Sequence, residues 1–221
     1  SAAEKYRYHF GSGAPIEQEQ RDAIAARVPQ FFYFSNYSVL PGETDLTGLA
    51  RKIEAGEGLD EQEQTVVSLL AHAGVKPADF LDTNYDSRKA ELQAAAVDLS
   101  REVFKYWRAN TDLEVVFGDD NVPVVEAPST AAVNHRFLKI ELRDGRHGNV
   151  ETNFATRSSG FQWFFSFFAA FSEYLHTDKP VVVLLDEPGT SLHGEAQKDF
   201  VNYIFNELGA AKQTLYTTHS Q

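Results

Sequence analysis

The feature that most restricts how this chain can fold is a continuous apolar run, Val181 to Leu185, which ends in Asp186-Glu187-Pro188. An uninterrupted apolar strand is buried on both faces, as a central strand of a parallel sheet must be. Ligands of α/β folds bind where the carboxyl ends of such strands lie. The sequence therefore predicts an α/β fold with two carboxylates at the edge where ligands bind.

An Asp-Glu pair at a buried strand end suits nucleotide hydrolysis. The aspartate of such a pair holds Mg²⁺ through its water shell, and the glutamate orients or deprotonates the attacking water. We therefore expect Asp186 to serve a metal and Glu187 to be catalytic. The alternative is a core strand that happens to end in a solvated acidic pair.

Two weaker motifs flank this strand. Arg157-Ser158-Ser159-Gly160-Phe161-Gln162 precedes an aromatic stretch, Trp163 to Tyr174, that is expected to be helical. Serines and a glycine at a helix start direct free N–H groups and the positive end of the helix dipole toward one place, which suits a phosphate. An ordinary serine N-cap explains the same residues.

The second motif is Thr217-Thr218-His219-Ser220, which follows a short β-prone run. A neutral histidine at a sheet edge can hydrogen-bond a γ-phosphate or hold the attacking water, although a lone histidine is more commonly a surface or packing residue. The order of the three motifs reinforces each of them, because one helix and a turn or strand fit between consecutive motifs. The segment Gly189 to His193 adds a loop that a partner subunit could contact.

In this order the motifs resemble the second half of an ATP-binding-cassette (ABC) ATPase. Ser158 to Gln162 resembles the signature, Asp186-Glu187 the Walker B pair, Gly189 to Leu192 the D-loop and His219 the switch histidine. The SMC/RecF-like branch is the most similar, and within it the AAA-type ATPases related to the OLD (overcoming lysogenization defect) family. The Pro29 to Gly42 stretch is also similar to their pre-arm segment.

The resemblance implies ATP and Mg²⁺ as cofactors and a homodimer that sandwiches the nucleotide. In such a dimer Ser158, Ser159, Gly160 and Gln162 act on the nucleotide of the partner subunit, while Glu187 and His219 are catalytic and Asp186 serves the metal. DNA repair, chromosome handling and antiphage defence all remain open as the biological task.

The chain departs from the family in one respect, since no segment of it fits the P-loop pattern G-x-x-x-x-G-K-[ST]. A P-loop supplies the amide groups and the lysine that bind the phosphates. We expect the P-loop to lie in an upstream segment or in a partner chain. A nuclease domain downstream of this chain also remains possible. The isolated chain should then be inactive, and the full-length protein should hydrolyse ATP.

The rest of the chain predicts a mainly helical region, 1–111, before the ATPase lobe, 112–221. The expected helices include Pro15 to Val28, one capped by Asp60 and Glu63 that stops at Gly74, and a long one, Ser87 to Asn110, that is either core-facing or the root of an arm. A small antiparallel element is expected from three strands, at Leu113 to Phe117, Phe137 to Leu142 and Val150 to Phe154, with a polar loop, Gly118 to Asn134, between the first two. The final helix is expected from Gly194 to Leu208 and the last strand from Gln213 to Thr217.

The amino-acid composition excludes some classes of protein and of binding site. The net charge of −12 does not support a broad nucleic-acid footprint, so DNA contact would require a local patch or another segment. The absence of cysteine excludes disulfides and Cys-ligated zinc. No signal peptide or membrane span is recognisable in the sequence, and we expect a soluble, cytoplasmic protein.

Two rival functions follow from the same residues. The first is a non-catalytic scaffold or dimerisation module that retains the ATPase fold, although a scaffold has no need of two adjacent carboxylates at a buried strand end. The second is a metal-dependent nuclease that uses Asp119, Asp120 and Glu126, a set that is explained more simply as a solvated turn.

Overall fold

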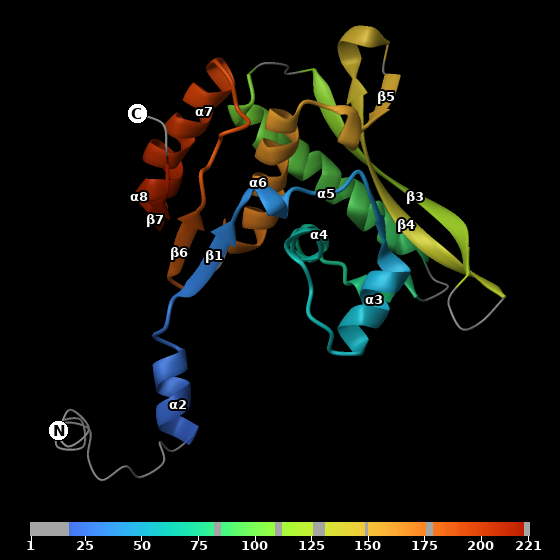
Figure 1. Ribbon diagram of the computed structural model, residues 1–221, viewed down its shortest axis with the longest axis horizontal. Helices are drawn as coiled ribbons and strands as arrows, with labels where there is room; N and C mark the ends of the chain where they lie inside the picture. Colours follow the sequence, from blue (N-terminus) through green and yellow to red (C-terminus); the bar gives the residue numbers. More distant parts are fainter. Residues whose placement is uncertain are drawn as a thin grey trace.

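A parallel sheet forms one end of the molecule. The computed structural model describes residues 18–81, 85–108, 112–125, 131–148, 150–175 and 179–218. Within them this sheet has three strands in the order β1 (Gln30–Phe34), β6 (Val181–Leu185) and β7 (Gln213–Tyr216), all parallel. Figure 1 shows them side by side. The predicted central position of Val181 to Leu185 and the parallel pairing of the last strand are confirmed, as is the α/β class.

The parallel sheet draws on both ends of the chain. β1 comes from the region that we expected to be mainly helical, and it pairs with β6 in register from Gln30↔Val181 to Phe34↔Leu185. The sheet therefore unites residues from both sides of the expected division at 111/112. Sequence reasoning recognised the β-prone run at Phe31 but could not tell which strand it would join.

The helix α6 (Ser159–Leu175) is the centre of the core. It contacts both the sheet and the helix α7 (Glu195–Tyr203). Phe167 shows this arrangement, since its ring lies 5.5 Å from that of Phe34 in β1 and 5.3 Å from that of Phe200 in α7. Each fully buried phenylalanine contributes about 1.5–3 kcal/mol of hydrophobic stabilisation. This explains why a helix so apolar on all sides belongs inside the molecule.

The long helix α5 (Tyr85–Tyr106) faces the core. Leu92, Ala96, Leu99 and Val103 are buried on one side of it, and the helix contacts both α6 and the strand β3 (Leu113–Val125). Of the two roles that the sequence left open for this helix, core packing is the one that the structure supports.

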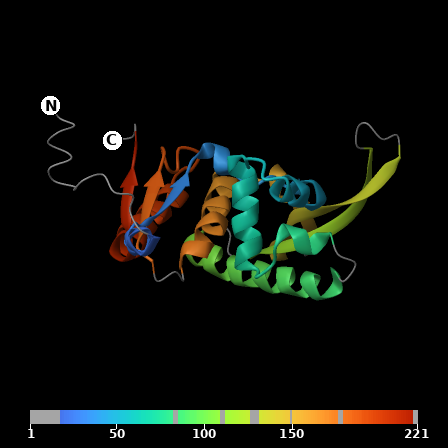
Figure 2. The ribbon, with the colours of Figure 1, turned by 90° about the horizontal axis from the view of Figure 1, so that it is seen from below.

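The projecting arm is a β-hairpin. β3 pairs antiparallel with β4 (Ala132–Asp144) along its whole length, from Leu113↔Asp144 to Val125↔Ala132, and the ribbon extends away from the helices in Figures 1 and 2. The expected loop from Gly118 to Asn134 is therefore wrong for most of its length. Ion pairs across the ribbon allow its polar residues to remain extended, for example Lys139–Asp120 at 2.9 Å.

Two short strands complete the antiparallel sheet among the described residues. β2 (Glu43–Asp45) and β5 (Val150–Asn153) both pair with β4. The expected antiparallel element is confirmed, and it is larger than predicted. Sequence reasoning missed β2 and the helix that follows it.

The other described helices are mostly short: α2 (Gln18–Ala25), α3 (Leu46–Glu54), α4 (Glu61–His72) and α8 (Gly209–Ala211), with 3₁₀ turns η1 (Asn36–Ser38), η2 (Pro77–Phe80), η3 (Gly145–His147) and η4 (Phe154–Thr156) and a π-helical turn η5 (Ile204–Leu208). The predicted capping box of Asp60 and Glu63 at the start of α4 is present, and Gly74 lies just past its end in the left-handed region. The expected helix from Gly194 to Leu208 changes to π geometry at Ile204. None of the described helices combines the length and apolarity needed to cross a bilayer.

Candidate functional site

Asp186 and Glu187 lie at the carboxyl end of the central strand, as predicted. The ladder continues one residue past β6, since the Asp186 N–H donates to the Phe34 carbonyl at 3.1 Å and the Thr217 N–H donates to the Leu185 carbonyl at 3.0 Å. Both neighbouring strands therefore fix the backbone that carries the two carboxylates.

Thr217 joins the two acidic residues through its hydroxyl. This hydroxyl donates to Asp186 Oδ1 at 2.7 Å and accepts the backbone N–H of Glu187 at 2.9 Å. A hydrogen bond to an ionised carboxylate is stronger than one between neutral groups. The bridge therefore orients Asp186 and holds the turn at Glu187 from the adjacent strand β7.

The backbone at Glu187 is strained. Its φ is +46°, and among the described non-glycine residues it is the one with a positive φ. Such a conformation is uncommon for a residue with a Cβ and costs on the order of 1–3 kcal/mol. Strain of this kind persists where the surroundings hold it in place, and it is concentrated at functional sites. The outlier falls on the residue that the sequence selects as the catalytic base.

Tyr33 is a neighbour of Asp186 that sequence reasoning did not select. It lies on β1 one residue before Phe34, and its side chain is 51% exposed. Partial burial raises the pKa of its hydroxyl, and the charges of Asp186 and Glu61 raise it further. The phenol therefore remains protonated at neutral pH and can act as a hydrogen-bond donor beside Asp186.

The predicted signature residues form the start of α6. The Ser158 hydroxyl accepts the N–H of Phe161 at 3.4 Å, which is an N-cap contact. The Gln162 amide donates to the carbonyls of Ala155 and Arg157 at 2.9 and 2.8 Å and to that of Phe154 at 3.3 Å. This –NH₂ group therefore holds the segment before the helix in place.

Gly160 packs against the loop that follows the Walker B pair. A Cβ at this position would lie 2.7 Å from the carbonyl oxygen of Ser191 and 3.3 Å from Leu192 Cδ2. Only glycine allows this approach without movement of the backbone. The two segments that the sequence identified as signature and D-loop are thus in direct contact within one chain.

A cavity of about 440 Å³ opens between these two segments. Ser159, Gln162 and Trp163 line it from α6, Thr190 and Ser191 from the loop, and Asn36 and Val39 from the turn after β1. Asn36 also donates to the Thr190 hydroxyl at 3.3 Å. Asp186 and Glu187 do not line this cavity, so the start of α6 lies beside the loop 189–192 and not beside the carboxylates of its own chain.

Not every predicted site residue can be placed. His219 lies outside the described residues, and the description ends at Thr218. Sequence reasoning also missed Asn36, although its position could have been found by the argument used for Asp186. Both residues follow a β-prone run at the same edge of a parallel sheet.

The carboxylate at position 186 fits a magnesium ion. Mg²⁺ prefers oxygen ligands and is commonly bound by one or two carboxylates together with water and nucleotide phosphates. Asp186 is exposed and offers carboxylate oxygens at the sheet edge. Among the described residues there is no group of three or more His, Cys, Asp or Glu that could hold a metal ion by itself.

The proposed nuclease residues are accounted for by ion pairs in the arm. Asp119 lies 3.4 Å from both Arg136 and Lys89, and Asp120 lies 2.9 Å from Lys139. Glu126 is outside the described residues. The interpretation of Asp119 and Asp120 as a solvated turn was wrong, because both are strand residues, but their role in the structure is pairing across the hairpin.

Comparison with known proteins gives a family match and partial likenesses to other proteins. The family model described as "AAA domain, putative AbiEii toxin, Type IV TA system" matches residues 51–221. An uncharacterized protein of Methanocaldococcus jannaschii is 27% identical over 134 residues, and the matched part is 58% of this chain and 31% of that protein. The chain thus spans about a third of that relative's length.

Among solved structures, the Smc head domain of Pyrococcus furiosus, with an extended coiled coil and bound to the C-terminal domain of ScpA, aligns with a TM-score of 0.36 and 14% identity. The alignment covers 65% of this chain and 33% of that chain.

Proposed function

Because the chain belongs to the AAA domain family whose model matches residues 51–221, we propose that it is the distal half of an ABC-type ATPase domain that binds and hydrolyses ATP with Mg²⁺. Within that class the motifs of residues 156–220 favour the SMC/RecF-like branch and the relatives of the OLD family. Asp186 serves the metal, Glu187 acts on the attacking water and His219 contacts the γ-phosphate. A second lobe supplies the P-loop.

The observation that carries this proposal is the Asp186–Thr217–Glu187 arrangement. Two acidic residues end the central parallel strand, and a hydroxyl from the neighbouring strand orients one carboxylate and pins the strained backbone of the other. A solvated acidic pair without a task needs neither the bridge nor the positive φ. The arrangement therefore favours catalysis over a scaffold role.

The face of the parallel sheet that points away from α6 supports the need for a second lobe. Phe31 and Leu215 are 60% and 49% exposed on this face, and Val182 and Leu184 lie between them in register with β1 and β7. Parallel sheets are normally covered on both faces. In the described part of the chain this face has no covering helix, and β7 is an edge strand. We propose that the P-loop lobe, from an upstream segment or a partner chain, packs here.

The position of the signature supports a homodimer. Ser159 lines the cavity beside the 189–192 loop, and Gly160 packs against that loop; neither Asp186 nor Glu187 lines the cavity. In the proposed dimer Ser158, Ser159 and Gly160 of one subunit contact the nucleotide that the partner subunit holds, and the helix N-terminus favours its negative charge. Gln162 contributes by holding the approach to this helix.

The test uses the full-length protein and two substitutions of the acidic pair. Glu187→Gln keeps the size and hydrogen bonding of the side chain but removes the base, so turnover should fall by about a hundredfold or more while ATP binding survives. The ATP-bound dimer should then accumulate, because γ-phosphate contacts that hold it closed are no longer lost to hydrolysis. Asp186→Ala should weaken Mg²⁺-ATP binding and dimerisation together.

Phosphate release and light scattering, each with and without Mg²⁺-ATP, measure these effects. Glu195→Gln, an exposed acid at the start of α7, is the matched control and should behave as the wild type. A fully active Glu187→Gln protein, or one that stays monomeric with ATP bound, would mean that Asp186 and Glu187 do not have the proposed roles.

A further inference from the structure

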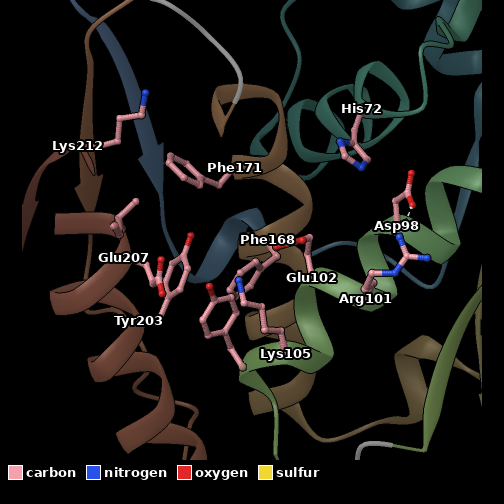
Figure 3. A pocket seen from close by; sticks show the side chains of 12 residues that line it. His72, Asp98, Arg101, Glu102, Lys105, Phe168, Phe171, Tyr203, Glu207 and Lys212 are labelled. Carbon is pink, nitrogen blue, oxygen red and sulfur yellow. Dashed lines mark hydrogen bonds and ion pairs between the residues drawn. The ribbon is translucent and has the colours of Figure 1, made fainter. Parts of the chain in front are cut away.

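A second cleft lies away from the proposed nucleotide site. Its volume is about 490 Å³, which is within the usual range of small-molecule sites. The end of α5 forms one wall, α7 and η5 form the other, and α6 lies at the base (Figure 3). Lys212 on its rim precedes β7, whereas Asp186 follows β6, so the cleft and the carboxylates are at opposite ends of the parallel sheet.

Aromatic rings from three helices form the inside of the cleft. Tyr106 of α5 lies 5.6 Å from Phe168 of α6 and 4.8 Å from Tyr203 of α7, and Phe168 lies 4.8 Å from Tyr203, all between ring centroids. Phe171 adds a fourth ring. The negative faces of such rings attract cations. No hydrogen bond of the Tyr203 hydroxyl is found among the described residues, and Figure 3 shows it directed into the cleft.

A cation of the chain itself already lies on one of these rings. Lys105 Nζ is 5.0 Å from the centroid of Tyr106. The pKa of Lys105 is raised, first by its contact with Tyr106 and also by the carboxylates of Glu102 and Glu207. The ammonium therefore lies against an aromatic ring, and the charges of two acids favour its protonated form.

The same two carboxylates act on the opposite wall. Burial raises the pKa of Tyr203, and the neighbouring Tyr106, Glu207 and Glu102 raise it further. Glu102 and Glu207 thus line the cleft from α5 and from η5, one on each wall. Of the other bases, Arg101 pairs with Asp98 at 3.2 Å, and Lys212 lies at the edge of the cleft in Figure 3.

The wall that carries Glu207 has unusual backbone geometry. Residues Ile204–Leu208 form a π-helical turn, and a Cβ at Gly209 would lie 2.8 Å from the Ile204 carbonyl oxygen. π-helical turns are rare and are frequently found at functional sites. Here the widened turn begins directly after Tyr203 and contains Glu207, the two residues of this wall that face the cation.

We propose that the cleft binds an organic cation, such as an alkylammonium or guanidinium group, against the ring of Tyr106 and beside the carboxylates of Glu102 and Glu207. Lys105 occupies the place of this cation when the ligand is absent. Its side chain is exposed, so an external cation displaces it at little cost. The ligand is either a free amine or a basic side chain of another protein.

Calorimetric titration of the full-length protein tests this inference with two probes. Spermidine represents a free polyamine, and N-acetyl-lysine N-methylamide represents a lysine side chain within a protein. Lys105→Ala removes the internal competitor, so at least one probe should bind about two- to fivefold more tightly, as expected for release of one exposed cation–π contact. The probe with the greater gain identifies the source of the ligand.

Matched variants separate the site from the general attraction of cations to an acidic protein. Lys198→Ala makes the same charge change on an exposed part of α7, outside the cleft, and should not increase the affinity for either probe. Replacement of both Glu102 and Glu207 by glutamine in the Lys105→Ala protein should abolish the gain in probe affinity. Glu195→Gln, made in the same Lys105→Ala protein, should lower the affinity only slightly. Equal affinities of the Lys105→Ala and Lys198→Ala proteins for both probes would overturn the proposal.

Discussion

The contact between the signature glycine and the D-loop gives the sharpest structural prediction. In Gly160→Ala the new Cβ would approach the Ser191 carbonyl oxygen to 2.7 Å, the Ser191 carbonyl carbon to 3.4 Å and Leu192 Cδ2 to 3.3 Å. The leucine methyl can move, but the carbonyl belongs to the backbone. Either the start of α6 or the loop must therefore shift, and overpacking of this kind costs about 1–3 kcal/mol.

Thermal unfolding, monitored by circular dichroism, measures the loss of folding stability in Gly160→Ala. For chains of about 150–250 residues, each 1 kcal/mol lowers Tm by about 2–4 °C, so Gly160→Ala should melt about 2–12 °C below the wild type. The matched control is Gly58→Ala. A Cβ there meets nothing within 4 Å, and restriction of the unfolded chain should stabilise this variant by up to about 1 kcal/mol.

The two variants are thus expected to shift Tm in opposite directions although they make the same chemical change. A Gly160→Ala protein as stable as Gly58→Ala would show that the two segments do not pack as described. It would also remove the physical reason for a glycine at this position of the signature.

Two further predictions concern activity and pH. The isolated 221-residue chain, without a P-loop, should release phosphate from ATP no faster than buffer, and turnover that Asp186→Ala abolishes would reveal a phosphate site within the chain. The hydrogen bond from Lys139 lowers the pKa of Asp120, so this pair stabilises the folded state above the ordinary aspartate pKa and ceases to do so as pH falls through the lowered value. Lys139→Gln should move the Asp120 titration upward in carbon-detected NMR, whereas an unchanged titration would mean that the pair does not form in solution.

Local sequence was sufficient to predict the elements whose cause is local. The apolar run Val181 to Leu185 predicts a buried parallel strand because such a strand has no polar face to present to water. The helix α4 was predicted with its cap because Asp60 and Glu63 satisfy each other's backbone N–H groups without help from the rest of the chain. Asp186 and Glu187 were placed correctly for a related reason, since they follow that strand directly.

The long hairpin could not be predicted because its cause is not local. Asp119, Asp120 and Asn121 are common turn residues, and their own sequence favours a loop. They are extended because β4 supplies backbone partners and cations across the ribbon. The π-helical turn after Tyr203 has no sequence signal that we recognise, and Gly209 only permits it.

The sequence by itself determined the order of the motifs, the central strand and the identity of the acidic pair, because these depend on hydrophobicity and spacing along the chain. Only the tertiary structure decided that Thr217 bridges Asp186 and Glu187, that Gly160 contacts Ser191, and that β1 joins the sheet. Each of these contacts unites segments that are far apart in the sequence. Their geometry is set by how α6 packs against both the sheet and α7, and no pattern along the chain encodes it.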